Sequence, residues 1–192
     1  MIVDSKEETL ALTEEGLFDF PDVTSHWVRL ASGAKAHYVT SGASGPPVIL
    51  LHGGLPGSAG LALWSHQLAA LGRAGFRVYA PDRPGFGLAD TRKEHWPSYG
   101  IFSWVDFVNN FVDALCLDHF HLAGNSQGTS VAAQYICEHP ERVISFAFVA
   151  SFSLMTQIGL DDDGKARERF PAKYQLIPWD GQEETMRKNL QS

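Results

Sequence analysis

The sequence predicts an α/β fold, in which a mostly parallel sheet carries helices on both of its faces. Strand-like and helix-like segments alternate along most of the 192-residue chain, and the connections are long enough for crossovers between parallel strands. One strand-like segment is apolar throughout, which is typical of a strand buried on both faces of a parallel sheet. A chain of this length can form one domain of ordinary size around a sizeable core.

The first elements are two short strands and then the buried one. The segments HWVRL and AHYVTS are strand-like, and the turn signal Ser32-Gly33 between them predicts an antiparallel hairpin. The apolar run at 48–51 predicts the buried strand. Residues 1–26 are acidic and weakly patterned, so we expect a leader that packs loosely or helically on the surface.

The alternation then continues to about residue 151. Apolar spacing and turn signals predict helices over 60–72, 101–117 and 127–139, and strands over 76–81, 119–125 and 143–150. Residues 152–192 are charged and supply no further buried strand. We therefore expect a boundary near 152, with the core domain over 27–151.

Composition excludes several classes of protein. The apolar content of 44% and charged content of 19% indicate a globular chain rather than a disordered one. A net charge of −7 without a basic stripe argues against a nucleic-acid binder. The N-terminus lacks a signal-peptide pattern and no apolar run is long enough for a membrane span, so we expect a cytoplasmic protein without membrane attachment. Cys116 and Cys137 lack metal-site spacing and are expected to be buried free thiols.

The segment HLAGNSQGTS contains the pattern G-x-S-x-G, at Gly124 to Gly128. It lies between a predicted strand and a predicted helix, where a serine can be exposed on a strained turn, the nucleophile elbow, if its neighbours are small. The free N–H groups at the start of the helix favour developing negative charge. We therefore expect Ser126 to be a nucleophile; the alternative is a structural turn serine.

The loop HGGLPG at 52–57 follows the buried strand directly. Hydrolysis at a carbonyl needs two donors for the oxyanion, usually backbone N–H groups. We expect one from Gln127, the residue after the nucleophile, and the other from Gly54, with Leu55 as the near alternative. Gly53, Leu55 and Asn125 are expected to contact the substrate. The loop matches no phosphate-binding pattern.

These segments together resemble the α/β-hydrolase fold family. VILLHGG, PDRPGFGLAD and HLAGNSQG occur in the order and at about the spacing seen in that family, over residues 27–151. The HGG loop and the Gly-Asn-Ser elbow are most similar to meta-cleavage-product hydrolases, which cleave carbon–carbon bonds. Those enzymes more often read Gly-Asn-Ser-Met-Gly-Gly, from which Gln127 and Thr129 depart. HGGLPG is also similar to proline iminopeptidases, whose elbow usually carries tryptophan after the serine. Serine at 126 argues against haloalkane dehalogenases and epoxide hydrolases.

The resemblance implies that Asp82, Arg83 and Asp90, around the RPGFG turn, form a structural loop near the mouth of the pocket. It also implies a triad in the chain order serine, acid, histidine. After Ser126 the sequence contains a single histidine, His139, about 20 Å along the elbow helix. A general base must come within about 3 Å of the serine oxygen, so His139 cannot serve.

The acid is no better placed. In some family members it follows the strand equivalent to 143–150, where this chain reads Ser-Phe-Ser; Asp161, Asp162 and Asp163 lie in what resembles the start of a lid over 152–192. We expect the sheet to be truncated before its last strands and the chain to be the N-terminal part of a hydrolase. Without the acid and histidine, the 192-residue chain should turn over little or no substrate.

Two classes of function remain open. The first is a serine hydrolase that uses no metal or cofactor and acts on a small molecule, at an ester or at a carbon–carbon bond next to a carbonyl. The second is a non-catalytic ligand-binding or interaction module. His52, or a group from a second chain, would be other sources of a base. An exposed strand edge at 143–150 would permit a homo-oligomer.

Overall fold

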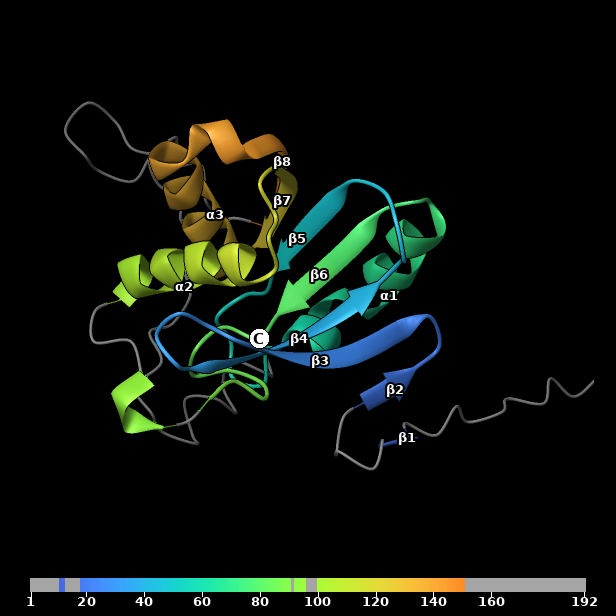
Figure 1. Ribbon diagram of the computed structural model, residues 1–192, viewed down its shortest axis with the longest axis horizontal. Coiled ribbons are helices and arrows are strands. Elements are labelled where there is room, and N and C mark those ends of the chain that lie inside the picture. The colour runs from blue at the N-terminus through green and yellow to red at the C-terminus, as the bar shows by residue number, and fades with distance from the viewer. Residues whose placement is uncertain (1–10, 13–17, 91, 96–99, 151–192) are drawn as a thin grey trace, which may run out of the picture. The chain divides into compact units, whose positions relative to one another are not determined.

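The computed structural model describes residues 11–12, 18–90, 92–95 and 100–150 (Figure 1). In this part of the chain, eight strands form one sheet in the order β1-β2-β3-β4-β6-β5-β7-β8. The strands are β1 (Ala11–Leu12), β2 (Phe18–Phe20), β3 (Val23–Arg29), β4 (Lys35–Ser41), β5 (Pro47–Leu51), β6 (Arg77–Pro81), β7 (Phe120–Asn125) and β8 (Val143–Val149). The helices are α1 (Gly60–Arg73), α2 (Gly100–Ala114) and α3 (Gln127–Glu138), with 3₁₀ turns at Lys93–His95 and Pro140–Arg142.

The sheet has a parallel half and an antiparallel half. β5 pairs in parallel with β6 on one side and with β7 on the other, and β7 pairs in parallel with β8. β3 and β4 form the predicted antiparallel hairpin, and β4 joins β6 in antiparallel register. The three α-helices are the connections between consecutive parallel strands, as the alternation of segments predicts.

The apolar strand β5 separates two cores. Ile49 and Leu51 pack in the core that α2 and α3 cover, whereas Val48 and Leu50 pack in the core that α1 covers. The two sets of helices accordingly lie on opposite faces of the sheet (Figure 1). All five residues of β5 are buried, which explains the absence of polar alternation. The predicted fold class is confirmed. No helix in the described segments is long and apolar enough to cross a membrane.

The N-terminal part differs from the expected loose or helical leader. β2 pairs with β3 through Phe20 and Val23, so strand structure starts well before residue 27. The physical reason is packing, since Val23 is 2% exposed and belongs to the core under α1. The weak pattern of the segment hides this, because a three-residue strand is too short to show alternation.

The prediction of buried thiols is wrong, since Cys116 and Cys137 are both exposed. Cys116 lies in the turn after α2, with a positive φ of 54°. Cys137 is the next-to-last residue of α3, beside the exposed Glu138. Apolar neighbours in sequence are thus poor guides to burial at the end of a helix.

The chain divides into two compact units, Met1–Ser153 and Leu154–Ser192. The second unit, with the predicted lid segment and Asp161, Asp162 and Asp163, lies outside the described residues. The core boundary near 152 and the lid assignment therefore stay predictions.

Candidate active site

Three loops meet at the carboxyl edge of the parallel strands. They follow β5 at His52, β6 at Asp82 and β7 at Ser126. From β5 the chain crosses to β6 on one side, and then returns past β5 to β7 on the other side. In open α/β sheets, this reversal of strand order opens the crevice where ligands bind.

Ser126 has the backbone conformation of a strained turn. Its φ and ψ are 50° and −118°, and it is the residue immediately before helix α3. Such a conformation costs about 1–3 kcal/mol in a residue other than glycine. Two hydrogen bonds hold it: the N–H of Ser126 donates to Val149 O at 2.9 Å, and the N–H of Thr129 donates to Ser126 O at 3.0 Å. β8 and α3 together therefore maintain the strain.

The two glycines of G-x-S-x-G are required by close backbone contacts. A Cβ on Gly124 would lie 2.5 Å from the carbonyl oxygen of Gly128. A Cβ on Gly128 would lie 2.6 Å from His52 O and would also overlap Leu51 O. The pattern thus reports how closely α3 approaches β7 and the end of β5.

The predicted oxyanion loop lies against this turn. A Cβ on Gly53 would be 3.1 Å from Asn125 Oδ1 and 3.4 Å from Ser126 Cβ, and one on Gly54 would overlap the Gln127 side chain. Five of the predicted site residues are therefore neighbours: Gly53, Gly54, Asn125, Ser126 and Gln127. The sixth, Leu55, is 76% exposed. The N–H of Gln127, at the first helical position, has no acceptor within the helix.

His52 is not placed to act as a base for Ser126. Its Nδ1 donates to Gly53 O at 2.7 Å, and its Nε2 accepts the N–H of Arg83 at 3.1 Å. Both ring nitrogens are thus occupied, and the side chain is fully buried. Burial and the nearby Arg83 cation lower the pKa of His52 to about 4, so the ring is neutral at pH 7.

Among the described residues, none forms a hydrogen bond with the Ser126 hydroxyl. His139 follows the last residue of α3, at the opposite end of this helix from Ser126, and its ring lies 4.8 Å from that of Tyr135. The described segments also contain no cluster of three histidine, cysteine or acidic side chains able to hold a metal ion.

One buried network of hydrogen-bonded side chains was not predicted from the sequence. Ser25 Oγ lies 2.6 Å from His37 Nε2, and His37 Nδ1 donates to Asp82 Oδ2 at 2.7 Å. This order of groups is that of a catalytic triad, but Ser25 lies inside β3, without a helix N-terminus or a turn to supply oxyanion donors. Asp82 also accepts the N–H groups of Gly60 and Leu88, at 2.7 and 2.8 Å. The network is therefore structural, and it joins four segments of the fold: β3, β4, the start of α1 and the loop after β6.

These contacts also set the ionisation of Asp82. Burial alone would raise the pKa of this carboxyl group, but the hydrogen bonds from His37, Leu88 and Gly60 outweigh burial and lower it. The carboxylate is consequently charged at neutral pH, and fully engaged. No signal along the chain identifies its partners, because they come from separate strands and loops.

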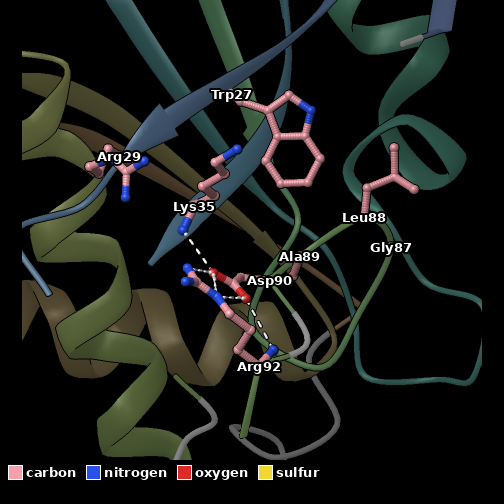
Figure 2. A pocket seen from close by; sticks show the side chains of 8 residues that line it. All are labelled: Trp27, Arg29, Lys35, Gly87, Leu88, Ala89, Asp90 and Arg92. Atoms are coloured by element: carbon pink, nitrogen blue, oxygen red, sulfur yellow. Dashed lines mark hydrogen bonds and ion pairs between the residues drawn. The ribbon is translucent and has the colours of Figure 1, made fainter. Parts of the chain in front are cut away.

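A groove of about 530 Å³ lies beside the loop after β6 (Figure 2). Its lining includes Trp27, Arg29, Lys35, Asp90 and Arg92. Figure 2 shows Asp90 joined to Arg92 and to the backbone of Lys35. The Arg92 guanidinium, with other hydrogen bonds, holds the pKa of Asp90 well below its ordinary value. Asp90 is therefore committed to these partners and offers no free carboxylate for acid–base chemistry.

The known proteins that are similar to this chain, as described below, are hydrolases. A family model described as the alpha/beta hydrolase fold matches residues 46–185. The chain is 36% identical over 134 residues to a 2-hydroxy-6-oxo-2,4-heptadienoate hydrolase of Pseudomonas putida, covering 69% of this chain and 47% of that protein. It is also 36% identical over 111 residues to a 2-hydroxy-6-oxo-6-phenylhexa-2,4-dienoate hydrolase of Burkholderia cepacia, covering 58% and 38%. The matched region thus spans less than half of either relative.

Solved structures share the architecture. A meta-cleavage product hydrolase from Pseudomonas fluorescens superposes with a TM-score of 0.58 at 34% identity, over 63% of this chain and 43% of that one. An epoxide hydrolase from Vigna radiata superposes with a TM-score of 0.60 at 26% identity, over 68% and 39%. The shared architecture therefore carries more than one hydrolytic chemistry.

Proposed function

Because the chain belongs to the α/β-hydrolase fold family, we propose that it carries the nucleophile and the oxyanion donors of a serine hydrolase. The observation that carries the proposal is the strained Ser126 turn, packed against the Gly53–Gly54 loop at the carboxyl edge of the sheet. A non-glycine residue at such a φ is costly and clusters at functional sites. The site residues have the roles that the sequence predicts.

The reaction begins at the carbonyl carbon of the substrate. Ser126 Oγ forms a bond to that carbon, the electron pair of the C=O moves to its oxygen, and the serine proton passes to a general base. The N–H groups of Gln127 and Gly54 stabilise the oxyanion. Its collapse breaks the bond to the leaving group, which takes up a proton. Water then hydrolyses the acyl-enzyme and frees Ser126.

The substrate class is a small molecule with an ester, or with a carbon–carbon bond next to a carbonyl. The relatives in Pseudomonas putida and Burkholderia cepacia are named as hydrolases of 2-hydroxy-6-oxo-dienoates, which supports the second type of bond. Identity of 36% over part of the chain supports the chemistry more strongly than the side chain of the substrate, since fold and family alone do not set specificity.

The acid and the general base lie, in this proposal, outside the described residues. His52 is fully engaged and His139 is remote. A serine hydroxyl with its ordinary pKa and no base beside it is a poor nucleophile. The 192-residue chain by itself is therefore expected to label slowly and to turn over little substrate.

A fluorophosphonate probe tests the assignment of Ser126. We expect stoichiometric labelling of Ser126 in the product of the complete gene, and labelling slower by at least about 10²-fold in the 192-residue chain, because general-base catalysis contributes about 10²–10⁴-fold. Ser126→Ala should abolish labelling and hydrolysis of acyl esters and 6-oxo-dienoates. Ser58→Ala, in the neighbouring loop, is the matched control and should leave both unchanged. Hydrolysis that persists in Ser126→Ala contradicts the proposal.

A non-catalytic binding module is the second candidate. The absence of a base beside Ser126 among the described residues favours it. Should the complete gene encode no further carboxylate and histidine, we expect ligand binding by calorimetry that Ser126→Ala leaves intact, without product formation.

A further inference from the structure

Arg83 is a buried cation beside the proposed oxyanion loop. Its side chain is fully buried, and the residue lies two positions after the end of β6. The guanidinium carbon lies 4.6 Å from the centre of the Trp104 ring and 5.2 Å from that of Phe86. Among the described residues, Nε and Nη1 of Arg83 have no hydrogen-bond partner and no carboxylate pairs with it. Burial of a charge without a partner lowers the stability of the fold. A functional role would explain why such a residue is kept here.

The one short hydrogen bond of this guanidinium fixes a particular peptide. Arg83 Nη2 donates to Gly53 O at 2.6 Å, and His52 Nδ1 donates to the same oxygen at 2.7 Å. The described chain contains no cis peptide bond, and in a trans peptide the C=O and the following N–H point in opposite directions. Anchoring the oxygen of Gly53 on the Arg83 side therefore turns the N–H of Gly54 away from Arg83.

The same nitrogen reaches the second half of the oxyanion site. Arg83 Nη2 lies 3.3 Å from Gln127 Oε1. Gln127 also supplies the other proposed donor, through its backbone N–H. Arg83 thus binds the oxygen of the peptide group that carries the Gly54 N–H, and it also contacts the side chain of Gln127, although it comes from a third loop.

We propose that Arg83 is a positioning residue, which aims and polarises the Gly54 N–H as an oxyanion donor. The inference rests on the proposed function of Ser126. A charged donor on the Gly53 carbonyl withdraws electron density from the amide, and hydrogen bonds in series strengthen one another. The Gly54 N–H becomes a better donor as a result, without any contact between Arg83 and the substrate.

The lack of a counter-ion among the described residues fits this role. Burial lowers the pKa of Arg83 to about 10, so the side chain remains charged at neutral pH. A carboxylate partner would neutralise it before reaction. Since the described residues supply none, the negative charge that develops at the oxyanion is the charge that Arg83 stabilises, and this favours the transition state over the ground state.

The test compares Arg83→Met and Arg83→Lys with the wild type, in the product of the complete gene. Methionine fills the space between Phe86 and Trp104 without a charge, and replacing a buried charge by an apolar group is often neutral or stabilising. We expect kcat to fall on the order of 10²-fold, as when an oxyanion donor is lost, with KM within about threefold and no loss of stability in urea. Lysine keeps one charged donor and should recover about tenfold of the loss.

Arg142→Lys is the matched control. Arg142 precedes the first residue of β8, at the end of the strand that is remote from Ser126. It pairs with Asp113 and donates to Leu117 O, so its substitution should lower stability and leave kcat unchanged. An equal fall of stability and kcat in Arg83→Met, or an unchanged kcat, would overturn the positioning role.

A second readout separates this inference from the proposed function. In the 192-residue chain, Arg83→Met should shift the amide proton of Gly54 upfield in an NMR spectrum, because the polarising donor is lost. An unmoved Gly54 resonance contradicts the inference even if Ser126 is the nucleophile. Conversely, failure of Ser126→Ala to abolish hydrolysis contradicts the proposed function, whatever the Gly54 shift.

Discussion

At the scale of single residues, His52 links ionisation to stability. Its folded pKa of about 4 lies below the ordinary value of 6.5, so the unfolded state binds more protons between these pH values. The stability that this group contributes is complete above pH 6.5 and is lost as the pH falls toward 4. At 1.36 kcal/mol per pKa unit, the loss between pH 7 and pH 4.5 is about 2–3 kcal/mol.

The measurement is urea unfolding of wild type and His52→Gln at these two pH values. We expect the glutamine variant to lose about 2–3 kcal/mol less than the wild type on acidification. His66 is exposed, and His66→Gln should follow the wild type. A His52 ring that titrates near 6.5 by NMR in the folded protein would contradict the lowered pKa and this prediction.

Single residues also mark the limit of what the sequence predicts at the site. Ser126 and the Gly53–Gly54 loop could be identified because each stands directly after a recognisable strand. The contacts that link Asp82 to His37, and Arg83 to His52 and Gly53, could not be assigned, since they join segments 30 or more positions apart. Such pairs leave no periodic signal along the chain.

At the scale of elements, the junction of β7 and α3 depends on Gly128. A Cβ there would meet the carbonyl oxygens at the end of β5, which are backbone atoms and cannot rotate away. Overpacking of this kind costs about 1–3 kcal/mol. We expect Gly128→Ala to lose at least that much stability and to displace the Ser126 turn, with slower labelling of Ser126.

Gly33→Ala is the matched control for this prediction. Gly33 has a positive φ of 86° but no atom within 4 Å of a built Cβ, so only backbone strain of about 1 kcal/mol is added. Chemical denaturation of both variants compares the free energy lost to steric overlap at position 128 with that lost to backbone strain at position 33. Equal losses in the two would contradict the close approach of α3 to β5.

Elements with a long or uniform signal were predictable, and short ones were not. The apolar run of β5 identifies the centre of the parallel half, because both of its faces are buried. β1 and β2, of two and three residues, carry no periodicity of their own. Their pairing depends on β3, which is set by the core under α1 rather than by local sequence.

At the scale of the molecule, β8 leaves apolar surface uncovered. Among the described strands it pairs only with β7, and Ile144, Phe146, Phe148 and Val149 are 38–58% exposed. An exposed apolar edge of this kind is a template for pairing with another chain. We expect the 192-residue chain to self-associate through β8, with a concentration-dependent mass in sedimentation equilibrium.

Phe148→Lys and Leu63→Lys separate this edge from general surface hydrophobicity, since both side chains are 38% exposed. Lysine at β8 should weaken association by about tenfold or more, the effect of exposing one large apolar side chain, whereas lysine on α1 should not. A monomeric wild type at about 100 µM, far above the micromolar range of specific association, would contradict the expectation.

The contacts of Asp82 bear on the order in which the molecule assembles. Helix α1 has no side-chain cap of its own at Ala59, and the N–H of Gly60 is satisfied by Asp82 Oδ1. This carboxylate is supplied only after the chain has left the helix and completed β6. On a ribosome, α1 would emerge with its first turn unsatisfied and would gain its cap when β6 docks beside β4 and β5. The first helix of the fold is therefore finished by a residue made after it, which couples its formation to closure of the sheet.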